Sequence, residues 1–400
     1  MQTPVPDPQT AADLAVPLGR VAVIGAGAMG TGIAQVAAQA GHEVVLVDAR
    51  EGAADEAVRR LGATLDKLAA KGKITAESAA ATRDRLSTVV SAADLPPCHL
   101  VIEAIVEDLA VKRELFATLA QRQSGDTILA SNTSSLSITA IAEGIDRPER
   151  VVGLHFFNPP PLMRLVEVVR GDASGPEVLE DAAELMRSWG KTPVQCTSTP
   201  GFIVNRVARP FYGEAQRMVA EGLCDAATVD AALRGAGFRM GPMELTDLIG
   251  QDVNLAVGTS VWEQTDHDPR YEPTDLQRDL VARGALGRKA GHGVFRYAED
   301  GSPLDADVDA AALARLVGGP VRTDPVARTL AMLVNEAVDL VARGEATAED
   351  VDTAMRLGTN YPRGPIEWGR EIGLDVVAQQ LRELDAAYPG GRYRPSPALT

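Results

Sequence analysis

The sequence is poor in cysteine and in aromatic residues, and each shortage excludes a class of function. Its 400 residues include only three cysteines, and Cys98, Cys196 and Cys224 show none of the close spacing of a zinc or disulfide framework. We therefore predict no metal site and a reducing compartment. Aromatic residues make up 4% of the chain, which is too few for a base-stacking platform. No apolar run reaches the length of about 20 residues that a membrane helix needs.

Positive charge is also scarce. Acidic residues outnumber basic ones by 55 to 39, which gives a net charge of −16. Nucleic-acid binding requires clustered Lys and Arg, so we do not expect nucleic acid as a partner. The lack of a long apolar run leads us to expect no membrane partner either. The first basic residue is Arg20, so the N-terminus lacks the charged start of a secretory signal. We expect a cytoplasmic protein whose residues 1–18 form a flexible leader.

Strand-like and helical patterns alternate over the first half of the chain. Ala- and Leu-rich helical stretches at Ala53–Ala70 and Leu109–Ala120 lie between β-branched runs. These strand-like runs are Arg20–Ile24, Glu43–Val47, Leu100–Ala104, Thr127–Ala130, Val151–Phe157 and Leu165–Val169. Such alternation is typical of a parallel sheet covered by helices on both faces. We predict an α/β Rossmann-type domain over residues 19–199.

The second half of the chain is helical and contains an internal repeat. Apolar residues from Val204 to Val219 recur at helix spacing, and Pro210 predicts a kink or a late helix start among them. Several markers recur at an offset of 122 and later 123 residues: Gly222, Asp230, Gly241-Pro242 and Ile249-Gly250 return as Gly344, Asp352, Gly364-Pro365 and Ile372-Gly373. We predict two related all-α modules, at 200–297 and 324–400, joined by a linker at 298–323.

A glycine-rich turn follows the first predicted strand. Gly25 permits a tight turn, Gly27 lets a pyrophosphate approach the backbone, and Gly30 lets the next helix pack closely. An ordinary structural turn is the alternative. Asp48 follows the second strand, 18 residues beyond Gly30, where a carboxylate can accept hydrogen bonds from an adenosine ribose. That carboxylate would repel a 2′-phosphate and predicts NAD, although the nearby Arg50 is the residue type that favours NADP.

Two polar residues interrupt apolar strand runs on either side of a proline-rich segment. If these runs pair antiparallel about Pro161, His155 lies opposite Glu167, with Cβ atoms about 5 Å apart. A carboxylate there would fix the imidazole tautomer and stabilise its charged form, which a general base for an alcohol requires. A lone buried histidine is more often a satisfied core residue, but this pairing favours catalysis.

Together the motifs resemble the L-3-hydroxyacyl-CoA dehydrogenase family. The resemblance is carried by Gly25-x-Gly27-x-Met29-Gly30, Ser131-Asn132-Thr133-Ser134-Ser135, His155-Phe156-Phe157-Asn158-Pro159 and Pro200-Gly201-Phe202-Ile203-Val204-Asn205-Arg206. The family implies a dinucleotide-binding domain, a helical domain, and a site in the cleft between them. It implies reversible, NAD-linked oxidation of an L-3-hydroxyacyl-CoA to a 3-oxoacyl-CoA.

The resemblance also implies roles for individual residues. His155 would be the catalytic base with Glu167 as its partner, and Ser134 and Asn205 would hold the reacting oxygen. Further positions match cofactor contacts in the family, namely Gly25, Gly27, Met29, Gly30, Asp48, Glu107, Lys112, Ser134, Asn158 and Lys289. Thr64, Lys71 and Lys112 match substrate-side positions, and Lys71 could equally be a solvated surface residue.

The second module departs from the family pattern. The position equivalent to Asn205 is Ala327, and the Pro-Gly-Phe segment before it is missing, so we predict that this module is not catalytic. It would instead cover the apolar face of the first module, giving a monomer with an internal pseudo-dimer, or else a homodimer. Three alternatives to an acyl-CoA enzyme stay open: the same chemistry on a carrier-protein-bound hydroxyacyl group, a free hydroxy acid as substrate, or a nucleotide-sensing protein without turnover.

Overall fold

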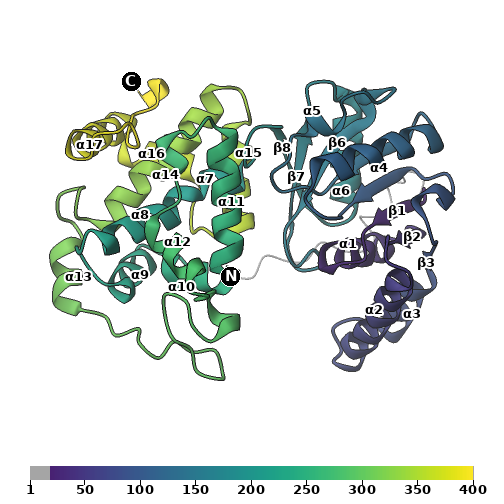
Figure 1. Ribbon diagram of the computed structural model, residues 1–400, viewed down its shortest axis with the longest axis horizontal. Helices are drawn as coiled ribbons and strands as arrows, with labels where there is room; N and C mark the ends of the chain where they lie inside the picture. The colour runs from purple at the N-terminus through teal and green to yellow at the C-terminus, as the bar shows by residue number, and fades with distance from the viewer. Residues whose placement is uncertain (1–18, 400) are drawn as a thin grey trace. The chain divides into compact units, whose positions relative to one another are not determined.

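The computed structural model describes residues 19–399, and the chain divides after Ser198 into two compact units (Figure 1). The predicted leader at residues 1–18 lies outside the described residues. The first unit holds the β-sheet, and the second is built from helices. This is the predicted fold class.

The first unit contains an eight-stranded sheet in the order β3-β2-β1-β4-β5-β6-β7-β8. Neighbouring strands are parallel except β6 and β7, which are antiparallel. The strands are β1 (Val21–Ile24), β2 (Val44–Val47), β3 (Leu86–Thr88), β4 (Leu100–Glu103), β5 (Ile128–Ser131), β6 (Val151–Phe156), β7 (Leu165–Arg170) and β8 (Thr192–Thr197). The predicted strands are present to within one residue at each end. The sequence pattern misses the two edge strands, because β3 is short and β8 carries Pro193, which only an edge strand tolerates.

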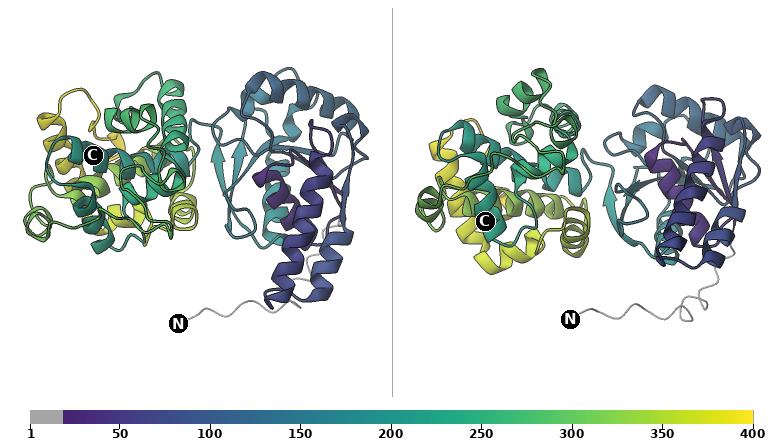
Figure 2. Two further views of the ribbon diagram at one scale, coloured as in Figure 1. Left: turned by 60° about the horizontal axis from the view of Figure 1, so that its bottom comes forward. Right: turned by 90° about the horizontal axis from the view of Figure 1, so that it is seen from below.

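Helices cover the sheet. Their bounds are α1 (Ala28–Gln39), α2 (Ala53–Ala70), α3 (Ala76–Asp84), α4 (Leu109–Arg122), α5 (Ile138–Ile141) and α6 (Pro176–Ser188). Apolar side chains from the sheet, α1 and α6 form one buried core, which includes Ile33, Leu46, Leu154 and Met186. Helices α2 and α3 lie side by side and project away from the sheet (Figures 1 and 2). They share a small apolar cluster of their own.

The second unit consists of helices and short 3-10 turns. Its helices are α7 (Val204–Val207), α8 (Arg209–Ala220), α9 (Ala226–Gly235), α10 (Pro242–Ile249), α11 (Gln251–Gln264), α12 (Asp275–Ala282), α13 (Ala310–Leu316), α14 (Pro325–Ala342), α15 (Ala348–Thr359), α16 (Pro365–Ile372) and α17 (Leu374–Ala387). Pro210 lies in the first turn of α8, so the predicted helix start is confirmed. The segment at 298–323 is more than a connection, because it contains α13, capped by the side chain of Asp309.

The two halves of the helical unit bury mirrored ion clusters. Arg206, Arg270 and Tyr271 contact the fully buried carboxylate of Glu336, at 2.5, 3.3 and 2.6 Å. At an offset of 122 residues, Arg328, Arg392 and Tyr393 contact the equally buried Glu214, at 2.8, 2.7 and 2.7 Å. Each half thus supplies two arginines and a tyrosine to a carboxylate of the other half. This reciprocity is the pattern of a symmetric dimer interface, here formed within one chain.

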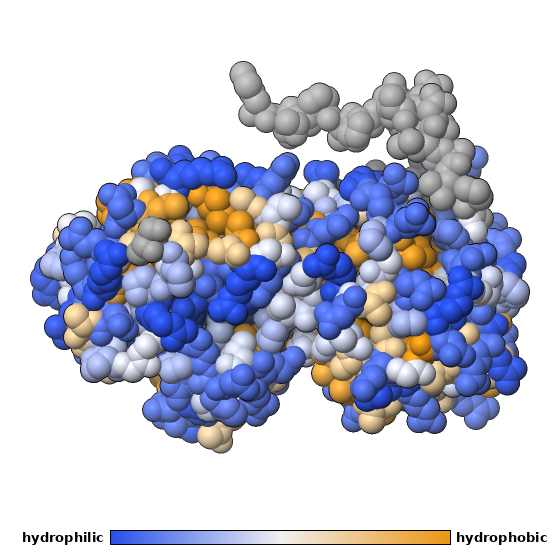
Figure 3. Space-filling model, turned by 90° about the horizontal axis from the view of Figure 1, so that it is seen from above, coloured by the Kyte–Doolittle hydropathy of each residue, from blue (hydrophilic) through white to orange (hydrophobic). Residues whose placement is uncertain are grey.

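Most of the face shown in Figure 3 is hydrophilic, and the apolar residues on it gather in separate patches. Among residues 19–399, no helix is both long and apolar enough to span a bilayer.

Candidate functional site

Most of the predicted site residues of the first unit lie near the carboxyl ends of its parallel strands. Gly25 directly follows β1, Asp48 directly follows β2, and Ser134 lies shortly after β5. His155 is near the carboxyl end of β6, which pairs parallel with β5. In open α/β sheets, ligands bind beyond the carboxyl ends of the parallel strands, where the strand order reverses. Here the order reverses between β1 and β4.

The glycine loop has the shape that a dinucleotide requires. A Cβ at Gly30 would lie 1.8 Å from the carbonyl oxygen of Gly25, and Gly25 itself has a φ of +108°. A Cβ at Gly27, by contrast, would meet nothing within 4 Å, so the backbone is open there to an approaching pyrophosphate. Helix α1 begins at Ala28 and points its N-terminal N–H groups toward this opening. The loop therefore fits the predicted cofactor.

Asp48 is tied to the glycine loop. One carboxylate oxygen accepts a hydrogen bond from the Ala26 N–H at 2.8 Å, and the other accepts one from the Arg50 N–H at 2.9 Å. Burial raises the pKa of Asp48, but these hydrogen bonds and the Arg50 charge outweigh burial and hold that pKa below its usual value. The guanidinium of Arg50 is largely exposed and lies 3.4 Å from the carboxylate. Asp48 is thus a fixed anion beside the turn.

The predicted pairing of His155 with Glu167 is confirmed by the strand register. The two residues are directly opposed across β6 and β7, and His155 Nδ1 lies 2.6 Å from Glu167 Oε2. His155 is 6% exposed and Glu167 is fully buried. With Nδ1 donating to the carboxylate, Nε2 is the nitrogen with the lone pair that can take up a proton. The arrangement can therefore support general base chemistry.

Glu107 accepts several hydrogen bonds from the loop that follows β5. Its Oε1 accepts hydrogen bonds from Thr133 Oγ1 at 2.6 Å, from the Ser134 N–H at 3.0 Å and from Ser135 Oγ at 3.1 Å. Burial raises the pKa of Glu107, but the nearby Lys112 ammonium and these hydrogen bonds hold it below the usual value. Glu107 is therefore an anion that fixes the backbone at Ser134.

A buried ion pair behind this loop was missed by the sequence reasoning. Glu103, the last residue of β4, is fully buried and lies 2.5 Å from the Nζ of Lys112, which is 1% exposed. Its carboxylate also accepts hydrogen bonds from Ser131 Oγ and the Ile105 N–H, both at 2.7 Å. Lys112 in turn reaches Glu107 at 3.2 Å. A charged residue inside the apolar run Leu100–Glu103 was the available signal.

The remaining predicted residues are scattered over both units. Thr64 lies on α2 with its hydroxyl bonded to the Arg60 carbonyl, and Lys71 ends the same helix; both are exposed. Met29 lies in the first turn of α1, and Asn158 follows β6. Asn205 on α7 and Lys289 in a 3-10 turn belong to the helical unit. Among residues 19–399, no group of three or more His, Cys, Asp or Glu side chains is placed to hold a metal ion.

Models of known protein families match nearly the whole chain. The model described as 3-hydroxyacyl-CoA dehydrogenase, NAD binding domain, matches residues 20–199. The model described as 3-hydroxyacyl-CoA dehydrogenase, C-terminal domain, matches residues 201–297 and again 325–400. The chain belongs to the 3-hydroxyacyl-CoA dehydrogenase family. It is an NAD-binding oxidoreductase, and the second match confirms that its helical domain is duplicated.

Proteins similar to this chain differ in length. The 3-hydroxyadipyl-CoA dehydrogenase of Escherichia coli K12 is 43% identical, and the match covers 95% of this chain and 96% of that protein. The probable 3-hydroxybutyryl-CoA dehydrogenase of Deinococcus radiodurans is 42% identical, over 69% of this chain and 99% of its own. A crystal structure of 3-hydroxybutyryl-CoA dehydrogenase from E. coli K12 is similar with a TM-score of 0.87 and 41% identity, covering 96% of this chain and 98% of that one.

Proposed function

We propose that this dehydrogenase interconverts L-3-hydroxyacyl-CoA and 3-oxoacyl-CoA with His155 as the general base. The buried hydrogen bond between His155 and Glu167, in the same unit as a dinucleotide-type glycine loop, carries this proposal. In the oxidation direction, the imidazole takes the proton from the hydroxyl group at carbon 3, and Glu167 stabilises the imidazolium that forms. In the reduction direction, the same imidazolium returns the proton to the carbonyl oxygen.

The reacting oxygen needs partners in both of its states. A hydroxyl group and a side-chain amide can each accept from an alcohol and donate to a carbonyl, so Ser134 and Asn205 are suited to hold it. Glu107 and its hydrogen bonds keep the backbone of Ser134 in place. These residues orient the substrate, and His155 moves the proton.

The first unit supplies the contacts for NAD. Gly25, Gly27 and Gly30 shape the loop for the pyrophosphate, Asp48 is the partner for the adenosine ribose, and Glu107 and Lys112 serve the nicotinamide side. NAD, when bound, takes or returns the hydride at carbon 3 of the substrate. Asn158, Met29 and Lys289 remain further candidate contacts for it, and Thr64 and Lys71 for coenzyme A.

The function is tested by NADH consumption with purified protein and acetoacetyl-CoA. We expect turnover with the coenzyme A thioester that exceeds turnover with acetoacetyl carrier protein and with free acetoacetate. Faster reaction of the carrier-bound form would show that the substrate is attached to a carrier protein and not to coenzyme A. Binding of NADH without turnover of any of the three compounds would contradict the enzyme function.

We further propose that the second helical module replaces a partner subunit. The mirrored clusters around Glu214 and Glu336 support this, because each module completes the ion pairs of the other. The protein would then work as a monomer with one catalytic helical module, while Ala327 marks the second module as structural.

A further inference from the structure

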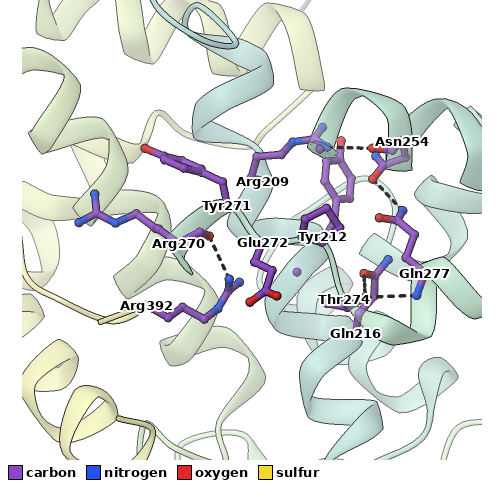
Figure 4. A pocket seen from close by; sticks show the side chains of 13 residues that line it. Arg209, Tyr212, Gln216, Asn254, Arg270, Tyr271, Glu272, Thr274, Gln277 and Arg392 are labelled. Atoms are coloured by element: carbon purple, nitrogen blue, oxygen red, sulfur yellow. Dashed lines mark hydrogen bonds between the residues drawn. The ribbon is translucent and has the colours of Figure 1, made fainter. Parts of the chain in front are cut away.

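Arg209 is a half-buried cation that forms no ion pair with a carboxylate of residues 19–399. Its Nε donates to the Asn205 carbonyl at 2.9 Å, and Nη1 donates to the Asn254 carbonyl at 3.3 Å. The guanidinium also lies 5.0 Å from the ring centre of Tyr212 (Figure 4). No Asp or Glu among the described residues forms an ion pair with it. Burial accordingly lowers the pKa of Arg209 below that of an ordinary arginine.

The four buried arginines of the mirrored clusters are neutralised, whereas Arg217, which is half-buried like Arg209, forms no ion pair with a described carboxylate either. Arg206 and Arg270 face Glu336, and Arg328 and Arg392 face Glu214. Leaving a cation without a counter-ion in such surroundings is unfavourable. Glu272 lines the same small cavity as Arg209 but forms no ion pair with it (Figure 4). An unpaired guanidinium at this position is therefore suited to an anion that arrives with a ligand.

Arg209 shares a helical face with Asn205. Among residues 201–210, only these two are partly exposed, and the others are buried. Residues four apart on a helix have Cβ atoms about 5–6 Å apart. The Arg209 side chain runs back toward α7, because its Nε binds the Asn205 carbonyl. The guanidinium therefore lies over the helical turn that carries the residue assigned to the reacting oxygen.

The internal repeat distinguishes residues that the helical fold requires, which both modules keep, from residues that the site requires, which only the first module has. The arginine and carboxylate of the mirrored clusters are kept, since Arg206 and Glu214 return as Arg328 and Glu336. Asn205 and Arg209 are instead both lost, and Ala327 and Ala331 stand in their places.

The surroundings of Arg209 change in the same way. Tyr212 and Asn254 correspond to Val334 and Val377, which are fully buried. The module that lacks the candidate substrate-binding amide thus lacks Arg209 and these two polar neighbours of Arg209 as well. The fold of a module therefore does not require Arg209. Its loss together with Asn205 indicates that the two residues serve the same site.

We propose that Arg209 binds the distal carboxylate of a dicarboxylic 3-hydroxyacyl chain, whose carbon-3 oxygen is held by Asn205. The inference rests on the proposed function and adds the substrate class to it. In a six-carbon dicarboxylic chain, the distal carboxylate is three carbons beyond the reacting carbon, a separation comparable to one helical turn. The guanidinium can pair with that carboxylate in bidentate geometry.

The test compares two six-carbon substrates that differ only at the distal end. These are 3-hydroxyadipyl-CoA, which ends in a carboxylate, and 3-hydroxyhexanoyl-CoA, which ends in a methyl group. We expect the full-length protein to favour the carboxylate by about tenfold or more in kcat/KM, because a site built for a polar group discriminates against its absence. Arg209→Met should reduce that preference by about tenfold or more, mainly through KM for 3-hydroxyadipyl-CoA.

The controls separate this inference from the function on which it rests. Arg283→Met removes the same charge from an exposed arginine that also bonds a backbone carbonyl, and it should leave the substrate preference unchanged. Arg209→Lys should retain part of the preference. Turnover of 3-hydroxyhexanoyl-CoA by the unaltered protein, with no preference for the carboxylate, would overturn the role of Arg209 and leave the dehydrogenase intact. An equal preference in Arg209→Met and the unaltered protein would overturn it too, whereas failure with both substrates would remove the function itself.

Discussion

At the residue scale, the site depends on charges that are buried together. His155 is paired with Glu167 across two strands, and Glu103 is paired with Lys112 behind the Ser134 loop. The first pair was predictable, because two polar residues in adjacent apolar runs lie at equal distances along the chain from the prolines between the runs, and antiparallel pairing places them opposite each other. The second was not, because Lys112 lies on a helix and the contact depends on how that helix packs against β4. Sequence spacing specifies neighbours along a strand pair better than neighbours between layers.

Glu103 should therefore matter although no contact with substrate or cofactor is assigned to it. Glu103→Gln leaves the buried Lys112 ammonium with Glu107 alone, and breaking a buried pair costs about 3–5 kcal/mol. We expect the freed ammonium to draw Glu107 away from the Ser134 backbone, which raises KM for NAD more than it lowers kcat. Steady-state kinetics with varied NAD, together with thermal unfolding, measure both effects.

A matched control for this variant is Glu114→Gln, which changes an exposed carboxylate on the same helix, α4. It should leave KM for NAD unchanged. A Glu103→Gln protein with unaltered KM and kcat but lower stability would show that this pair supports only the fold.

At the element scale, position in the sheet decided what the sequence could predict. Central strands such as β1 and β2 are continuous apolar runs, because both of their faces are covered. The edge strands β3 and β8 mix polar residues with apolar ones, so their pattern does not differ from that of a loop. In the helical unit, the repeat was visible through its glycines and aspartates. Asp230 and Asp352 explain this, since each accepts backbone N–H bonds from the helix that follows the Gly-Pro pair.

The mirrored clusters make a prediction about α8. Glu214→Gln would leave the guanidinium groups of Arg328 and Arg392 without their buried counter-charge, at a cost of about 3–5 kcal/mol. Chemical unfolding at pH 7 should show that loss, while Glu349→Gln, an exposed substitution in the second module, should change little. Equal stability of the two variants would contradict a structural role for the cluster.

The same carboxylate should make stability depend on acidity. Burial raises the pKa of Glu214, but the Arg392 and Arg328 charges and the Tyr393 hydroxyl outweigh it and bring that pKa to about 2. Since the folded-state pKa is depressed below the usual 4.5, the stabilisation is complete above about pH 4.5 and is lost as the pH falls toward 2. The Glu214→Gln protein should therefore show a smaller loss of stability over that range.

At the scale of the whole molecule, duplication of the helical module is the main difference from the shorter relatives. The D. radiodurans protein is matched over 99% of its length by 69% of this chain, so it has no counterpart of the second module. In the present chain, α14 of that module packs against α8 of the first. The family resemblance and the repeat predicted this arrangement. The reciprocity of its ion pairs was not predictable, because it depends on how the two modules face each other.

Removing the second module should change the oligomeric state. A chain ending after Tyr297 loses Glu336, Arg328 and Arg392, which exposes the apolar face of α8 together with uncompensated charge. Such a face promotes association. Light scattering should give a monomer for the full-length protein and a dimer or aggregate for the shortened one. A shortened protein that stays monomeric and soluble would contradict the internal pseudo-dimer.

The central claim is that an imidazole supported by a carboxylate transfers the proton. Its most direct test measures NADH binding and turnover in the His155→Ala protein. NADH affinity should stay within about twofold of the unaltered protein, while kcat for acetoacetyl-CoA falls by about 10²–10⁴-fold, the usual contribution of a general base. His267→Asn is the control, because this exposed histidine lies in the helical unit at a left-handed φ that asparagine tolerates. Turnover in His155→Ala equal to that of the control would contradict the claim.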